Sequence, residues 1–223
     1  MSEKFVKIIF TADCLYLGER IKKGTFKPAI SPRGKRYKQG NILPDTLPVP
    51  YSTITGALRA LFGELTDIHA IGKMTKYNVE YMSIAPFDSA LIAAKLPITV
   101  EYMTDITGEI YVKQTNNLPS LQILNSGFVM GGMKSKGFGS CKVIFIDKDY
   151  QPKIIEQERK FLSRIYYDDE IMKHFGISSA NITKAYWGYL FRKTSEFNGY
   201  YQKSLFEQSI IINGYDFLVE VTK

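Results

Sequence analysis

A glycine-rich segment holds the densest group of residues suited to phosphate binding. Five glycines and two lysines fall within residues 127–140, GFVMGGMKSKGFGS. Glycine permits backbone conformations with positive φ and lets the main chain approach a ligand closely, so its N–H groups can cradle phosphate oxygens. Lys134 and Lys136 would supply positive charge beside them. The same composition also fits a glycine-rich turn with solvated lysines, and the segment alone does not separate the two.

The spacing excludes the two common phosphate-binding loops of nucleotide enzymes. A Walker loop has the form GxxxxGK[ST], a dinucleotide fingerprint has the form GxGxxG, and both open a helix. Here the apolar run CKVIFI, residues 141–146, follows at once and predicts a strand. Nucleotide binding of either kind is therefore not predicted.

A second group of polar residues lies at the start of a predicted helix, residues 52–65. Prolines precede it, Ser52 is suited to the N-cap position, and apolar residues recur at helical spacing. The positive end of the helix dipole favours an anion there. Gly56 costs roughly 1 kcal/mol against alanine, which points to close packing or a close backbone approach. Arg59 could reach a phosphate, although a solvated helix face would also account for it.

Residues 18–50 form a long segment punctuated by glycine and proline. From Arg20 to Asn41 there is no acidic residue. The basic residues of this stretch are Arg20, Lys22, Lys23, Lys27, Arg33, Lys35, Arg36 and Lys38. Such a segment has the composition of an RNA-contacting arm that orders on binding, and a solubilising insertion is the alternative.

Composition narrows the class of protein. The chain has 223 residues, a net charge of +7 and 45% apolar residues, which fits a globular protein with a sizeable core and an affinity for polyanions. Neither Cys14 nor Cys141 has a CxxC partner, so no metal and no cofactor are predicted. No apolar run is long enough for a membrane span, and the first residues lack the features of a signal peptide. We therefore expect a cytoplasmic protein.

The elements that would position these groups are mostly strands. Residues 5–17 predict a central first strand, and the apolar runs within 79–113 predict two or three strands with a hairpin turn at Thr107-Gly108. Residues 119–126 fit a short helix or a strand. With the helix and the last strand already described, this order predicts the α+β class and a ferredoxin-like β-α-β-β-α-β unit that carries a long basic insertion.

The predicted ferredoxin-like domain covers residues 1–149, with its insertion at about 18–50. Residues 150–223 are expected to be a C-terminal α/β extension packed on it and not an independent domain. Its predicted elements are helices near 153–165 and 180–192 and a hairpin over 209–222 that turns at Asn213-Gly214. Its many aromatic residues favour a core or a partner interface over base stacking. They are Tyr166, Tyr167, Tyr186, Trp187, Tyr189, Phe191, Tyr200 and Tyr201.

The pairing of LPVPYSTITGALRALFG with GGMKSKGFGSCKVIF resembles the RAMP superfamily of CRISPR-associated proteins. Members of that superfamily have a ferredoxin-like or RRM-like fold. They typically carry a helix of the form P-x-S-x-x-x-G-A-L-R after the first strand and a glycine-rich loop of the form K-S-R-G-F-G before a later strand. Here the helix motif is Pro50 to Arg59 and the loop is Lys134 to Gly139, with Lys136 where arginine is frequent.

Three roles in CRISPR antiviral defence compete within that superfamily. Some members cut the guide precursor with a histidine near the helix, and His69 lies after the helix here. Backbone subunits of type III complexes cut target RNA with an aspartate before the helix, and Asp45 lies in that interval within a poorly matching context. A third group caps one end of a type III or type I effector complex and holds the 5′ handle of the guide RNA. The chain resembles this third group most, which implies binding without cutting.

The resemblance implies guide RNA, RAMP backbone subunits and the large subunit as partners, with no membrane. It also extends the set of predicted RNA-binding residues across both motifs and the basic segment. The predicted residues are Lys134, Ser135, Lys136, Gly137, Phe138, Gly139, Gly131, Gly132, Ser52, Thr53, Thr55, Arg59, Arg20, Lys22, Lys23, Arg33, Lys35 and Arg36.

Two other functions stay open from the sequence. An endoribonuclease without a metal would need a general acid and base near the scissile 2′-hydroxyl, and His69, His174, Tyr16 and Lys136 are weak candidates. With a metal, Asp45 would be the candidate. The third possibility is a structural protein that uses its aromatic C-terminal third as an interface.

Overall fold

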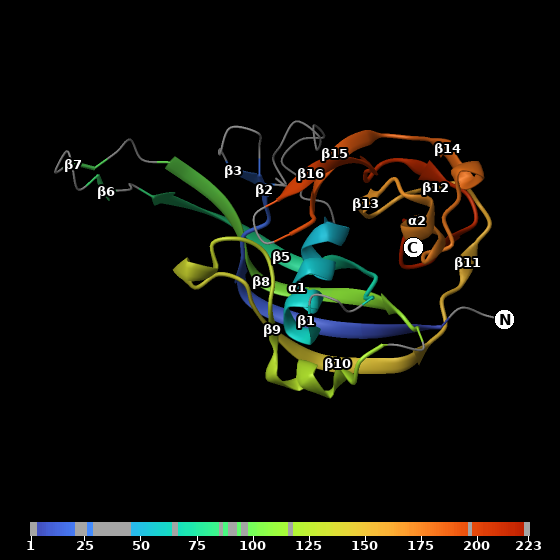
Figure 1. Cartoon of the computed structure of the whole chain (residues 1–223), viewed down its shortest axis with the longest axis horizontal. Helices are drawn as coiled ribbons and strands as arrows, with labels where there is room; N and C mark the ends of the chain where they lie inside the picture. Colours follow the sequence, from blue (N-terminus) through green and yellow to red (C-terminus); the bar gives the residue numbers. More distant parts are fainter. Residues whose placement is uncertain are drawn as a thin grey trace.

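The computed structural model describes residues 4–20, 26–28, 46–63, 67–84, 87–88, 93–94, 98–115, 118–195 and 198–220. Within these ranges, its main feature is an antiparallel six-stranded sheet in the order β4-β5-β8-β1-β10-β9, across the lower half of Figure 1. The strands are β1 Phe5–Leu15, β4 Leu47–Val49, β5 Ala70–Ile84, β8 Ile98–Lys113, β9 Phe128–Val129 and β10 Ser140–Tyr150. A mostly antiparallel sheet with few helices confirms the α+β class.

The first strand is central, as predicted. β1 pairs with β8 along one side, from Phe5 opposite Lys113 to Leu15 opposite Met103, and with β10 along the other. Helix α1, Tyr51–Phe62, connects β4 to β5, and the 3₁₀ helix η2, Leu121–Ser126, precedes β9 and β10. The chain therefore runs strand, helix, two strands, short helix, strand, with the four long strands in the order β10-β1-β8-β5.

Helix α1 packs against the sheet through the apolar stripe that the sequence predicts. Ile54 and Leu58 are buried in a core with Phe10 of β1 and Ile110 of β8. Each such side chain stabilises the fold by about 1.5–3 kcal/mol. The helix lies close because the sheet presents Gly72 beneath it, where an added Cβ would come within 2.6 Å of Ile54 Cδ1.

Glycine also decides the shape of β8. The predicted hairpin turn at Thr107-Gly108 is wrong, because β8 runs unbroken through both residues. Gly108 is required for packing instead, since an added Cβ would lie 2.5 Å from the ring of Phe10. The positive φ of this strand lies at Asp105, with a value of 50°.

The remaining described elements are short. Beside the main sheet lie β2 Gly18–Arg20, β3 Phe26–Pro28, β6 Phe87–Asp88, β7 Ala93–Ala94 and the 3₁₀ helix η3 Lys134–Lys136. The C-terminal part holds β11 Ile154–Ile155, β12 Arg159–Lys160, β13 Ile165–Tyr166, α2 Asp169–Lys173, η4 Ser179–Asn181, β14 Ile182–Lys184, β15 Trp187–Lys193, β16 Gly199–Leu205, β17 Ile210–Ile211 and β18 Gly214–Tyr215. This part lies over the upper right of Figure 1, with β15 beside α1.

The helices predicted near 153–165 and 180–192 are wrong, because both stretches form strands. In the first stretch, several of the apolar residues at helical spacing lie in short strands that pair with distant strands, as Ile165 does with Leu205. In the second, aromatic residues alternate along β15, which suits a strand. The predicted hairpin over 209–222 is also wrong: the chain turns near Asn213, but β17 pairs with β12 and β14, and β18 with β11.

A second core joins the C-terminal part to the sheet. Phe5 of β1 packs against Phe217 and Phe175, with ring centroids 5.1 Å and 6.2 Å apart. Tyr111 of β8 stacks on Phe217 at 4.3 Å. Tyr51, the first residue of α1, belongs to the same cluster. The start of α1 is therefore held by residues from both halves of the chain.

Candidate nucleic-acid interface

The start of α1 is buried and differs from the predicted one. The N-cap is Pro50 with no side-chain cap, so Ser52 lies inside the first turn and the predicted Ser52 N-cap is wrong. The N–H of Tyr51 donates to the carbonyl of Arg164 at 2.9 Å. Because this carbonyl comes from the C-terminal part, the protein itself occupies one donor at the positive end of the helix, where the sequence predicts an anion.

The glycine-rich loop folds back on the end of β1. Gly132 N–H donates to the carbonyl of Tyr16 at 2.8 Å, and Gly139 N–H donates to that of Cys14 at 3.0 Å. An added Cβ at Gly131, whose φ is +88°, would lie 2.6 Å from the Tyr16 carbonyl oxygen. Glycine is needed here for a close approach to the protein's own backbone. The loop therefore has fewer free N–H groups for a phosphate than its composition suggests.

A surface pocket of about 260 Å³ lies between this loop and α1. Its lining residues come from three segments: Leu17 after β1, Thr53, Gly56 and Ala57 of α1, and Gly131, Gly132 and Lys134 of the loop. The structure thus brings the two predicted motifs together at one pocket. An exposed ammonium group, a hydroxyl and unshielded backbone surround it, which suits an anionic ligand.

The other predicted loop residues lie elsewhere. Ser135, Lys136 and Gly137 are exposed on the short turn η3. Phe138 is buried and packs edge-on against Tyr102, with centroids 5.2 Å apart, so its ring is a structural support of the loop. Lys134 is the basic residue of the loop that lines the pocket.

Ser52, Thr55 and Arg59 lie on a different face of α1, toward the C-terminal part. Thr55 is buried with 3% exposure, and the Nε of Arg59 has no hydrogen-bond partner among the described residues. The predicted group of α1 residues is therefore divided: Thr53 lines the pocket, whereas these three lie on the side toward Tyr51 and Tyr166.

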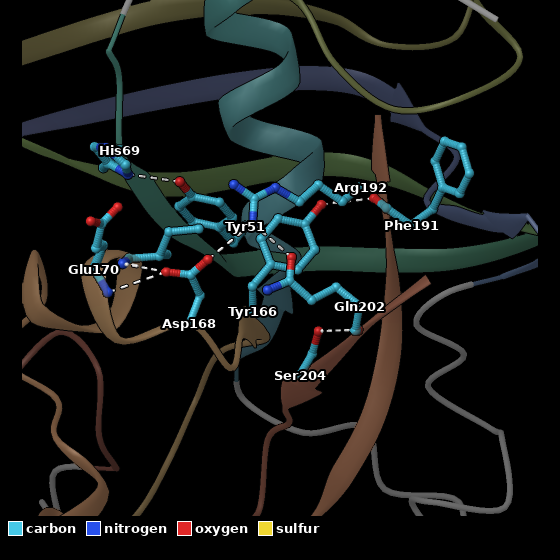
Figure 2. Close-up of polar contacts among 10 residues, drawn as sticks. Tyr51, His69, Tyr166, Asp168, Glu170, Phe191, Arg192, Gln202 and Ser204 are labelled. Carbon is cyan, nitrogen blue, oxygen red and sulfur yellow. Dashed lines mark hydrogen bonds and ion pairs between the residues drawn. The ribbon is translucent and has the colours of Figure 1, made fainter. Parts of the chain in front are cut away.

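His69 forms a hydrogen-bonded chain with Tyr51 and Asp67 on that second face, and Figure 2 shows its bond with Tyr51. Its Nδ1 is 2.8 Å from the Tyr51 hydroxyl and its Nε2 is 2.8 Å from Asp67 Oδ1. Burial raises the pKa of Tyr51 to about 12, so the phenol keeps its proton and donates it to Nδ1. Nε2 then carries the other proton and donates it to Asp67. The ring of His174 stacks on His69 at 3.8 Å.

The geometry indicates that His69 has a structural role. Its side chain is 7% exposed and both ring nitrogens are engaged. Burial lowers the pKa of His69, and the neighbouring His174 acts in the same direction. A catalytic acid or base must come within hydrogen-bond reach of a substrate. Here the imidazole joins Tyr51 to Asp67.

A polar network fixes the hairpin β15–β16 beside α2 (Figure 2). Asp168 caps α2 by accepting from the N–H groups of Glu170 and Ile171, and its other oxygen pairs with Arg192 Nη1 at 3.0 Å. Burial opposes ionisation of Asp168, but these hydrogen bonds outweigh it and hold the pKa of the carboxyl below its ordinary value. Arg192 also donates to Gln202 at 2.8 Å.

Sequence reasoning missed two features of the surface. Leu17 lines the pocket because β1 ends beside the glycine loop, which no local pattern indicates. Tyr189 is 61% exposed and Trp187 43% exposed, so the core is wrong for these two rings, and the partner interface stays a prediction. Their period-2 alternation was the signal that could have placed them on a strand.

Several predicted residues lie outside the described residues. They are Lys22, Lys23, Arg33, Lys35, Arg36 and Asp45. Arg20 lies in β2, where it pairs with Phe26 of β3. Among the described residues, no group of three His, Cys, Asp or Glu side chains could hold a metal ion, and no helix is long and apolar enough to cross a membrane.

Comparison with known proteins gives a likeness of fold. No protein-family model and no curated protein matches the sequence. A chain in the cryo-EM structure of "the Type III-B Cmr-beta bound to cognate target RNA" is similar in structure, with a TM-score of 0.54 at 13% sequence identity. The alignment covers 92% of this chain and 86% of that chain, so the shared fold includes the C-terminal part.

Proposed function

We propose that this chain is an RNA-binding subunit of a CRISPR ribonucleoprotein effector complex and that it holds the guide RNA at its 5′ handle. The observation that carries the proposal is the pocket between α1 and the glycine-rich loop. Thr53 and Gly56 lie on one wall and Gly131, Gly132 and Lys134 on the other. Two segments far apart in the sequence, each predicted from its composition to bind phosphate, meet at one surface pocket.

The fold supports this proposal. The order β10-β1-β8-β5, with a helix and a 3₁₀ helix in the connections, supports the proposal of a ferredoxin-like unit, in which the 3₁₀ helix would stand for a shortened second helix. We take residues 1–149 as a RAMP domain with its insertion at about 18–50, and residues 150–223 as an extension that shares its second core. The similar chain belongs to a CRISPR complex that is bound to RNA. In this proposal other effector subunits are partners, and the complex works in the cytoplasm.

Phosphate binding would rest on side-chain charge more than on the loop backbone. The N–H groups of Gly132 and Gly139 are already bonded within the protein. Lys134 in the pocket and Lys136 on the adjoining turn would then supply most of the attraction, and the basic segment around residues 20–38 would add to it. Electrostatic binding of this kind weakens steeply as the salt concentration rises, because the release of counterions from the RNA into a saltier solution gains less entropy.

We propose holding without cutting. An acid–base ribonuclease needs a titratable group beside the RNA backbone. His69 is 7% exposed and engaged at both nitrogens, and Tyr16 is 3% exposed. Asp45 lies outside the described residues. Incubation of the chain with guide precursor and with target RNA, with and without Mg²⁺, tests this point. Cleavage that is lost on Asp45→Ala or His69→Ala would overturn it.

The direct test recovers the tagged chain from its native host and sequences the RNA that comes with it. We expect small RNAs that share one short 5′ sequence, carried in a particle of several subunits. The double variant Lys134→Ala with Lys136→Ala should reduce their recovery. Lys148→Ala with Lys153→Ala is the matched control, because it also removes two exposed lysines, one at the far end of β10 and one just after it.

Two results would contradict the proposal. One is a particle without enriched small RNA, which would favour a structural subunit. The other is equal loss of RNA in the Lys148→Ala with Lys153→Ala control and in the Lys134→Ala with Lys136→Ala variant. In that case the recovery of RNA would depend on the net charge of the chain and not on the pocket.

A further inference from the structure

The hairpin β15–β16 exposes an unusual number of aromatic rings. Tyr189 is 61% exposed, Tyr200 48%, Trp187 43% and Tyr201 37%. Large aromatic side chains contribute most to folding or binding energy when they are buried. A group of exposed rings on one hairpin therefore marks a surface that binds something.

The strand register gathers several of these rings on one face. In β15, Trp187, Tyr189 and Phe191 point to the same side because side chains alternate along a strand. Tyr189 lies opposite Lys203 of β16, and Phe191 lies opposite Tyr201. The ring of Tyr189 has no ring or cation partner among the described residues, and with 61% exposure much of its surface is accessible to a ligand.

Lysine ammonium groups lie close to these aromatic rings. Lys203 Nζ lies 4.0 Å from the ring centroid of Trp187 and 5.2 Å from that of Tyr167. Lys184 Nζ lies 5.5 Å from the ring of Tyr186. Residues 182–205 contain four basic residues and one acidic residue in the sequence. The surface therefore combines flat aromatic faces with positive charge.

The hairpin is held rigidly. Tyr166 donates its hydroxyl proton to the carbonyl of Phe191 at 2.7 Å, and Arg192 bridges Asp168 and Gln202 on the other face (Figure 2). A surface fixed in this way would lose little conformational entropy when a flat ligand binds.

We infer that the face of β15–β16 that carries Trp187, Tyr189 and Lys203 is a stacking surface for unpaired bases of single-stranded RNA. The inference rests on the proposed function for the kind of polymer and assigns a second contact beyond the pocket. Aromatic faces with neighbouring basic side chains bind single strands by stacking and charge. Cores of protein–protein interfaces are depleted in lysine, which disfavours a protein occupant. β15 also contacts α1, the helix that lines the pocket.

The sequence supplies its own reporter, since Trp187 is the single tryptophan of the chain. We would titrate the purified full chain with a single-stranded uridine oligonucleotide and with an RNA duplex. Tryptophan emission should be quenched by the single strand and little by the duplex. Tyr189→Leu should weaken binding roughly 5- to 150-fold, the range found for loss of one base–aromatic stack. Tyr189→Phe should leave binding unchanged, because it keeps the ring.

Separate results decide the two proposals. Fluorescence anisotropy of a labelled oligonucleotide measures total binding in each variant. If the single strand binds, yet Trp187 emission and Tyr189→Leu affinity stay unchanged, the stacking surface is refuted and the pocket stands. If quenching occurs while Lys134→Ala with Lys136→Ala binds normally, the hairpin stands and the pocket is refuted. Absence of binding at low salt, with the hairpin covered by another subunit in the particle, would refute RNA as the occupant.

Discussion

Replacing Gly56 with alanine should raise the stability of the protein and weaken its proposed function. Gly56 lies near the middle of α1, is exposed, and has no atom within 4 Å of an added Cβ. Glycine in a helix interior costs about 1 kcal/mol against alanine, and nothing here opposes the gain. For a chain of this size, 1 kcal/mol corresponds to a rise of roughly 2–4 °C in Tm.

The same methyl group would enter the wall of the proposed phosphate pocket, which Gly56 lines together with Thr53 and Lys134. We therefore expect a higher Tm in calorimetry together with weaker binding of single-stranded RNA in anisotropy titrations. Ala60→Gly is the matched control, because Ala60 is exposed on the same helix outside the pocket lining. It should lower Tm by a similar amount and leave RNA affinity unchanged. A lower Tm for Gly56→Ala would refute the argument that an added methyl group fits at this position without a clash. Unchanged RNA affinity would refute a close approach of RNA to this helix.

Three further predictions follow from buried groups. Glu207→Ala should lower the free energy of unfolding by about 3–5 kcal/mol in urea titrations, because it removes the carboxylate that pairs with the Arg164 guanidinium, a charge buried at 1% exposure; a loss below about 1 kcal/mol would contradict this. The folded-state pKa of His69 lies below its ordinary value, so the unfolded chain takes up the proton first and stability should fall as pH drops below about 6.5; in thermal melts His69→Gln should flatten that dependence. Burial raises the pKa of Cys141 to about 12, so iodoacetamide should modify Cys14 first, and equal rates by mass spectrometry would refute the burial of Cys141.

Local patterns predicted the elements whose own apolar pattern is long and unbroken. The apolar spacing of Ile54 and Leu58 gave helix α1, and the β-rich run from Phe5 gave a central strand. The pairing of the two motifs was also predictable as a resemblance. The pocket at which the two motifs meet was not predictable, because it depends on hydrogen bonds from N–H groups of the loop to the carbonyls of Cys14 and Tyr16.

The failures share a physical cause, which is pairing with distant residues. Ser52 is a good N-cap in isolation, but the carbonyl of Arg164 takes the N–H of Tyr51 and shifts the helix start. The C-terminal stretches contain apolar residues at helical spacing, and strand partners such as Leu205 override that periodicity. Propensity is a weak prior wherever tertiary contacts compete with it.

The contact of Phe5 with Phe217 has a consequence for how the chain acquires its structure. The two residues stand near opposite ends of the described chain, so the second core closes only when almost all of it is available. Such a pattern raises the mean sequence separation of contacts, which slows folding. During synthesis, Phe5 of β1 and Tyr111 of β8 would stay exposed until Phe217 leaves the ribosome. A chaperone or a partner subunit could bind that apolar surface in the meantime.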